Sequence, residues 1–88
     1  MIPGKTKSGF DFKISEEQMD DYELLEGLVE IDKGNQTAII DVISRLLGEE
    51  QKNKLKEHLR GANGRVTASG MITEITNIFE ICNQGKNS

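Results

Sequence analysis

The sequence predicts a small, mainly α-helical domain of the α+β class, in which an N-terminal β-hairpin packs on a bundle of about four short helices. Apolar and polar residues alternate over residues 10–14, which is typical of a half-buried strand. From residue 19 onward, apolar residues recur every three or four positions, as in amphipathic helices. Breaks that contain glycine, at residues 34–35, 48 and 61–64, divide this helical part into four pieces.

The chain has 88 residues, enough for one domain, which we place at residues 1–84 with a polar tail at residues 85–88. The net charge is −4, and no apolar stretch has the length of a signal-peptide core or a membrane-spanning helix. Cys82 is the single cysteine, so the chain cannot form an internal disulfide. These features predict a cytoplasmic protein without a membrane partner.

The N-terminal 14 residues are predicted to form the hairpin. Residues 10–14 would be its second strand, and their two phenylalanines should pack on the helices because a two-stranded ribbon is not stable alone. Residues 7–9 form the turn and residues 2–6 the first strand. Pro3 lacks a backbone N–H group, which suits an edge strand.

The first predicted helix spans residues 15–33. Ser15 and Gln18 have the spacing of a capping box at its start. The helix ends at Gly34, which we expect in a left-handed conformation. Its apolar face is broad enough to contact two neighbours, and comprises Met19, Tyr22, Leu25, Leu28 and Val29, widened by Leu24 and Ile31.

Three further helices follow. Residues 36–47 are the most apolar segment and should form the centre of the core, ending at Gly48. Residues 49–60 are polar except for a core-facing line at Leu55 and Leu59. The last helix is predicted over residues 67–83, with an apolar stripe formed by Met71, Ile75, Ile78, Phe79 and Cys82.

No set of residues in the sequence predicts catalysis, a cofactor or a metal site. His58 is the only histidine, and its helical neighbours include no acid that would orient it as a base. The acidic residues 16–21 lack the central glycine and terminal glutamate of a calcium-binding loop. Residues 61–64 are rich in glycine but lack the lysine and hydroxyl of a phosphate-binding loop. We therefore expect a protein that is not an enzyme and acts through its surfaces.

The charge is unevenly distributed along the chain. Residues 11–32 contain nine acidic residues and one lysine, whereas residues 52–65 contain five basic residues and one acid. This pattern fits either solvated helix faces or a patch that steers a protein partner. A helix-turn-helix DNA reader is disfavoured because Glu49 and Glu50 occupy the helix start that would meet the major groove, so we predict no nucleic-acid partner.

The order of several motifs resembles that of the small tail assembly chaperones of long-tailed bacteriophages of Gram-positive hosts. The resemblance covers nearly the whole chain and is carried by Asp20–Glu26 (DDYELLE), Arg45–Gln51 (RLLGEEQ), Leu55–Arg60 (LKEHLR), Gly64–Val66 (GRV) and the segment from Met71 to Glu80. The chain departs from the family at Thr67, where a proline often opens the last helix.

This resemblance implies a non-catalytic protein of the host bacterial cytoplasm that binds the tape measure protein, assists assembly of the tail tube around it, and contacts the major tail protein. The contact residues we expect are Tyr22, Leu24, Ile31 and Ile81, as apolar residues left over from the core. Self-association remains open. The Lys86-Asn87 pair can be encoded by a slippery sequence, which fits the frameshifted long forms of such chaperones.

Two alternatives from other classes remain. The first is a structural head or tail component that stays in the phage particle. The second is a small DNA-binding regulator that uses the basic residues 52–65.

Overall fold

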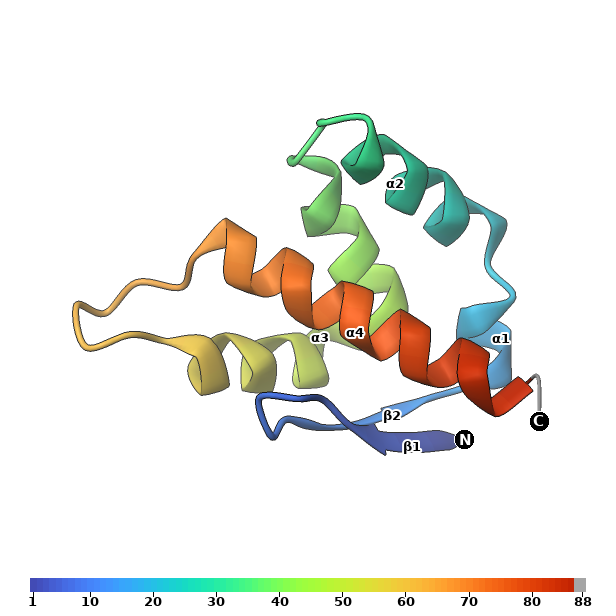
Figure 1. Cartoon of the computed structure of the whole chain (residues 1–88), viewed down its shortest axis with the longest axis horizontal. Helices are drawn as coiled ribbons and strands as arrows, with labels where there is room; N and C mark the ends of the chain where they lie inside the picture. The colour runs from blue at the N-terminus through green and yellow to red at the C-terminus, as the bar shows by residue number, and fades with distance from the viewer. Residues whose placement is uncertain (87–88) are drawn as a thin grey trace.

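The computed structural model describes residues 1–86 and confirms the predicted mainly helical α+β class (Figure 1). An N-terminal hairpin is followed by helices that pack on it and on each other. The elements are β1 (Ile2–Lys5), β2 (Asp11–Ile14), α1 (Glu16–Met19), α2 (Tyr22–Asp32), α3 (Ala38–Leu59) and α4 (Ala68–Lys86). The last helix extends into the predicted tail as far as Lys86, and the remainder of that tail, Asn87 and Ser88, lies outside the described residues.

The hairpin has the predicted antiparallel pairing, in which Ile2 faces Ile14 and Gly4 faces Phe12. Its apolar side is buried, since Phe12 and Ile14 expose almost no surface. Contacts from β2 reach α3 and contacts from β1 reach α4, so the ribbon lies across both helices (Figure 1). The prediction that the hairpin phenylalanines pack on the helices is therefore confirmed.

The predicted continuous helix over residues 15–33 is wrong, because the chain breaks between α1 and α2. The capping box at the start of α1 is confirmed: the Gln18 N–H donates to Ser15 Oγ at 3.0 Å, and the Ser15 N–H donates to Gln18 Oε1 at 2.8 Å. The second helix then starts anew, because Asp21 Oδ1 accepts hydrogen bonds from the N–H groups of Glu23 and Leu24.

The predicted boundary at Gly48 is present as a bend inside α3, where the backbone leaves the helical conformation. Gly48 has φ 76° and ψ 170°, a conformation that a residue with a side chain rarely adopts. The two halves of α3 consequently run in different directions in Figure 1. The predicted stop at Gly48 is thus confirmed as a change of direction, and Leu55 in the second half is fully buried as expected.

The last helix starts without a proline, because Thr67 caps it instead. The Gly70 N–H donates to Thr67 Oγ1 at 3.0 Å, which satisfies one free donor of the first turn. The predicted apolar stripe of this helix is largely confirmed. Its buried members are Met71, Ile75, Ile78 and Cys82, and Phe79 is half-buried against the same core.

A close contact in the core joins α2 to the first half of α3. A Cβ atom added to Gly27 would lie 2.4 Å from Cγ2 of Val42, a residue that is itself fully buried. Val42 is β-branched and has little rotamer freedom in a helix, so it cannot easily move aside. The absence of a side chain at Gly27 therefore sets how closely the two helices approach.

We predict that Gly27→Ala destabilises the protein, and that Val42→Ala relieves this effect. Overpacking costs about 1–3 kcal/mol, and the better helix propensity of alanine offsets about 1 kcal/mol of it. Val42→Ala alone should cost about 2 kcal/mol. Urea unfolding of both single variants and the double variant should give a double-mutant cost about 1 kcal/mol smaller than the sum. Strictly additive costs would show that Gly27 does not limit the helix approach.

Candidate interaction surface

The four predicted contact residues do not share one environment. Tyr22 is exposed, whereas Ile31 and Ile81 are half-buried and pack against the core. The prediction for Leu24 is wrong, because this side chain is fully buried. The reason is the new start of the helix at Tyr22, which places Leu24 on the side of α2 that meets α3.

Three apolar side chains of α2 face solvent and form what we call the α2 stripe: Tyr22, Leu25 and Val29. Their exposed fractions are 72%, 43% and 51%. Spacings of three and four residues place them on one face, roughly opposite the face of Leu24 and Gly27. The sequence placed all three on one broad apolar face with Met19 and Leu28, and of the three it predicted only Tyr22 as a contact residue; Met19 is buried and Leu28 half-buried.

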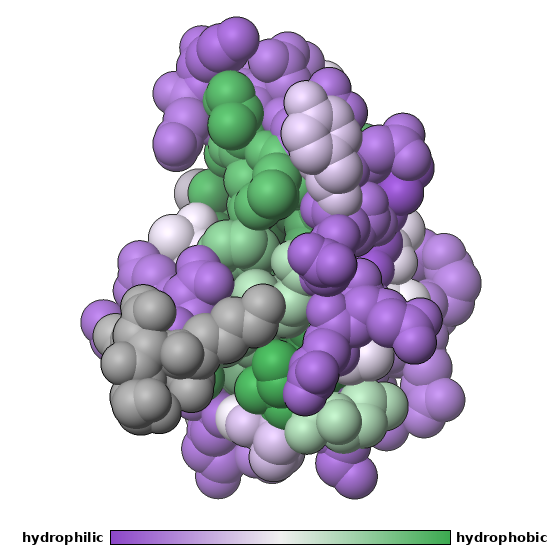
Figure 2. Space-filling model, turned by 90° about the vertical axis from the view of Figure 1, so that its right-hand side faces the viewer, coloured by the Kyte–Doolittle hydropathy of each residue, from purple (hydrophilic) through white to green (hydrophobic). Residues whose placement is uncertain are grey.

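The α2 stripe borders a shallow groove of about 350 Å³ whose edge is mainly acidic. Glu26, Glu30 and Lys33 line it together with the stripe, and Lys33 Nζ lies 3.7 Å from Glu30 Oε2. Figure 2 shows the side of the molecule that includes α2, where apolar side chains form a band between polar surfaces. An apolar strip with a charged edge is the arrangement that proteins use to bind amphipathic segments.

A cluster of charges around Arg45 holds α2 in this orientation. The guanidinium lies 2.9 Å from Asp41 Oδ2, 3.3 Å from Asp21 Oδ2 and 3.4 Å from Glu23 Oε2. Hydrogen bonds to Asp41 and then Asp21 raise the pKa of Arg45. Partial burial raises the pKa of Asp21, but hydrogen bonds from the Leu24 N–H, Arg45 and the Glu23 N–H outweigh it, so the pKa lies below the usual value of 3.8.

A serine, a histidine and a glutamate meet at the hairpin turn, but their connections do not form a catalytic triad. The Ser8 hydroxyl donates to Glu74 Oε1 at 2.8 Å, and His58 Nε2 lies 3.1 Å from Ser8 Oγ and 3.2 Å from the Ser8 carbonyl. Since the only hydroxyl proton of Ser8 goes to Glu74, His58 Nε2 must carry a proton and donate. A general base would accept the serine proton instead.

This network has a structural role. Glu74 is buried and also accepts a hydrogen bond from the Thr6 hydroxyl at 2.8 Å, while the Lys7 N–H donates to Asn77 Oδ1 at 2.8 Å. The His58 ring additionally lies 5.7 Å from that of Phe10. The turn is thereby attached to both α3 and α4. Neighbouring residues in the sequence give no sign of this contact, because Ser8 is 50 positions away from His58.

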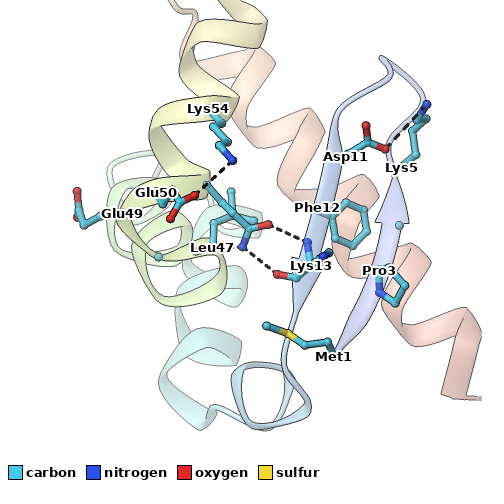
Figure 3. A pocket seen from close by; sticks show the side chains of 13 residues that line it. Met1, Pro3, Lys5, Asp11, Phe12, Lys13, Leu47, Glu49, Glu50 and Lys54 are labelled. Carbon is cyan, nitrogen blue, oxygen red and sulfur yellow. Dashed lines mark hydrogen bonds and ion pairs between the residues drawn. The ribbon is translucent and has the colours of Figure 1, made fainter.

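A wide groove of about 1000 Å³ lies between the hairpin and the bend of α3 (Figure 3). Gln51 bridges it: its side-chain amide accepts from the Lys13 N–H at 2.7 Å and donates to the Lys13 carbonyl at 2.8 Å. Charged groups on the walls pair with each other, as in the Lys54–Glu50 contact of 3.3 Å. Gln51 therefore joins α3 to the hairpin edge across this groove.

The basic segment 52–65 is partly neutralised by its own helix. The ion pairs are Lys52–Glu49 at 2.7 Å, Lys54–Glu50 at 3.3 Å and Arg60–Glu57 at 2.6 Å. The hydrogen bond between the last two side chains lowers the pKa of Glu57 and raises that of Arg60. These pairs weaken the positive field that a DNA-binding face needs.

We predict that Asp21→Asn reduces the acid sensitivity of the fold. The folded-state pKa of Asp21 is lowered, so its stabilising contribution is complete above 3.8 and disappears as the pH falls through the lowered value. Asparagine caps helices about as well as aspartate but cannot form the ion pair with Arg45. The variant should have a lower urea midpoint at pH 7 and a flatter decline between about pH 5 and about pH 2.

Glu23→Gln is the matched control for this prediction, because it removes an exposed partner of Arg45 and keeps the helix cap. Its midpoint at pH 7 should change less than that of Asp21→Asn, since exposed pairs contribute little. Parallel declines of Asp21→Asn and the unaltered protein on acidification would assign the acid sensitivity to other carboxylates.

Among residues 1–86, no helix is long and apolar enough to cross a membrane, and no group of three or more histidine, cysteine or acidic side chains is placed to hold a metal ion. Comparisons of this chain with protein-family models, curated proteins and solved structures gave no match.

Proposed function

We propose that this protein is a non-catalytic assembly chaperone that binds the tape measure protein of a long-tailed bacteriophage in the host cytoplasm and assists tail tube assembly. The observation that carries the proposal is the α2 stripe, an exposed apolar strip on a helix that is otherwise well anchored. The motif order described above supports the choice of client. A tape measure protein is a long helical client, and its amphipathic segments are the chemistry that such a strip accepts.

The dimensions of the α2 stripe support transient binding. Three side chains bury far less surface than the roughly 1,200–2,000 Å² of a stable complex, so each contact should be weak and reversible. Many copies along one long client would still keep it covered, because neighbouring contacts raise the effective concentration. A chaperone that must leave before the tail is complete needs contacts that are weak one by one but numerous along the client.

The acidic border of the stripe supports selectivity. Glu26 and Glu30 beside the apolar residues favour client segments whose apolar face is flanked by lysine or arginine. They also oppose binding between two stripes, since like charges would face each other. The major tail protein remains a second proposed partner.

The test is co-expression with the tape measure protein. We expect the unaltered chain to keep the client soluble and to co-purify with it, and the double variant Leu25→Gln/Val29→Gln to retain about tenfold less client. Glutamine is a good helix former, and both positions are exposed, so the fold should persist. Ile40→Gln is the control, because it removes a still more exposed apolar side chain from a different helix.

Two results would contradict the proposal. The first is a tape measure protein that stays insoluble and unbound in the presence of the unaltered chain. The second is recovery of this chain in stoichiometric amounts from purified virions, which would assign it to the structural components of the particle.

A further inference from the structure

A second apolar surface lies on α3, away from the α2 stripe. Ile40 is 72% exposed, although its neighbours Ile39 and Ile43 are buried. It borders a groove of about 340 Å³, which we call the Ile40 groove, formed by Ile40, Ile43, Val66, Met71, Lys52 and Lys56. The floor comes from core side chains, so the groove is continuous with the packed interior.

The bend at Gly48 creates this groove. Because α3 changes direction there, its second half brings Lys52 and Lys56 to the same concavity as Ile40 in the first half. The segment before α4 and its first turn supply the remaining wall through Val66 and Met71. A concavity between helices is the usual receptor for an amphipathic helix.

The edge of the Ile40 groove is cationic, opposite in sign to the edge of the α2 stripe. Lys52 and Lys56 are four residues apart and therefore lie on one side of the helix. Lys52 Nζ is held 2.7 Å from Glu49 Oε2, whereas Lys56 makes no ion pair with any of the side chains that the structure describes. Lys56 is thus available to an acidic group of a ligand.

We propose that the Ile40 groove binds an acidic amphipathic helix of a partner protein. Apolar side chains of that helix would cover Ile40, and one of its carboxylates would pair with Lys56, while Lys52 adds positive charge to the same edge. This partner differs in chemistry from the client of the α2 stripe, so the inference does not depend on the proposed chaperone function. An apolar floor with only two lysines, in a chain of net charge −4, does not suit nucleic acid or an anionic membrane.

A second copy of this chain is a poorer fit than a separate partner. The acidic helix that a second copy would offer is α2, and two of its carboxylates are already engaged. Glu23 contacts Arg45 and Glu30 contacts Lys33 within the same molecule. If α2 of a second copy docked in the groove, the groove lysines would have to compete with Lys33 and Arg45 for these two carboxylates.

The test uses two synthetic helical peptides of about 15 residues with the same leucine stripe, one flanked by glutamate and the other by lysine. Fluorescence anisotropy is measured with the full chain carrying Leu25→Gln/Val29→Gln, because the α2 stripe, with its acidic edge, would itself bind the lysine peptide. This chain should bind the glutamate peptide, and it should bind the lysine peptide at least tenfold more weakly. Ile40→Gln and Lys56→Glu should each weaken binding of the glutamate peptide about tenfold. Added salt should weaken it as well.

Matched controls separate the groove from general charge and fold effects. Lys54→Glu makes the same charge change on the same helix outside the groove, and Val29→Gln removes an apolar residue from the α2 stripe. Both should bind the glutamate peptide within about twofold of the unaltered chain. Circular dichroism of every variant should match that of the unaltered chain.

Several outcomes would overturn the proposal. Equal binding of both peptides by the chain that lacks the α2 stripe, or equal effects of Lys56→Glu and Lys54→Glu, would show that the groove does not recognise the charge of its ligand. Concentration-dependent association in sedimentation that disappears in Ile40→Gln would assign the groove to a second copy. Binding to vesicles rich in phosphatidylserine that disappears in Lys56→Glu, without binding of the glutamate peptide, would assign it to a membrane surface.

Discussion

The backbone of Gly48 determines how one long helix serves two parts of the molecule. With φ at 76°, the chain turns between the halves of α3, so that the first half packs against α2 and the second half against the hairpin. A residue with a side chain would meet strain at this φ, which favours glycine there. The core depends on this turn, because Val42 and Leu46 lie before it and Leu55 lies after it, all fully buried.

Polar contacts complete what a small apolar core cannot provide. A two-stranded hairpin is marginal in water, and this one is fixed at both ends. Gln51 pairs with the backbone of Lys13 along one edge, while Glu74 receives the hydroxyls of Thr6 and Ser8 at the turn. The buried carboxylate is satisfied by these donors, in keeping with the rule that buried polar groups find partners.

Much of the fold follows from local patterns in the sequence. The alternation around Phe12 predicted the hairpin, the Ser15–Gln18 pair predicted the helix cap, and Gly48 indicated the break within α3. The break before α2 did not follow, because Asp20 and Asp21 are both compatible with a helix start or a helix interior. What distinguishes Asp21 is Arg45, a partner 24 positions later, and such a contact has no local signal.

The interaction surface was predictable in part. The breadth of apolar residues in the first helical segment indicated two neighbours, and α3 is the neighbour that α2 contacts most extensively among the described residues. The new helix start at Tyr22 determines which residues of α2 face outward. As a result Leu24, predicted as a contact residue, is buried, and Leu25 is exposed. The Ile40 groove depends on the tertiary meeting of α3 with α4, so spacing along the sequence could not reveal it.

The position of Tyr22 has a practical consequence. The chain has one tyrosine and no tryptophan, and that tyrosine stands exposed at the start of the α2 stripe. Its ultraviolet absorption and emission are therefore those of a solvated phenol, undisturbed by energy transfer to an indole. Any ligand without aromatic residues that covers the stripe will change that spectrum, so the protein contains its own optical label at this surface, whereas occupation of the Ile40 groove will leave the label in water.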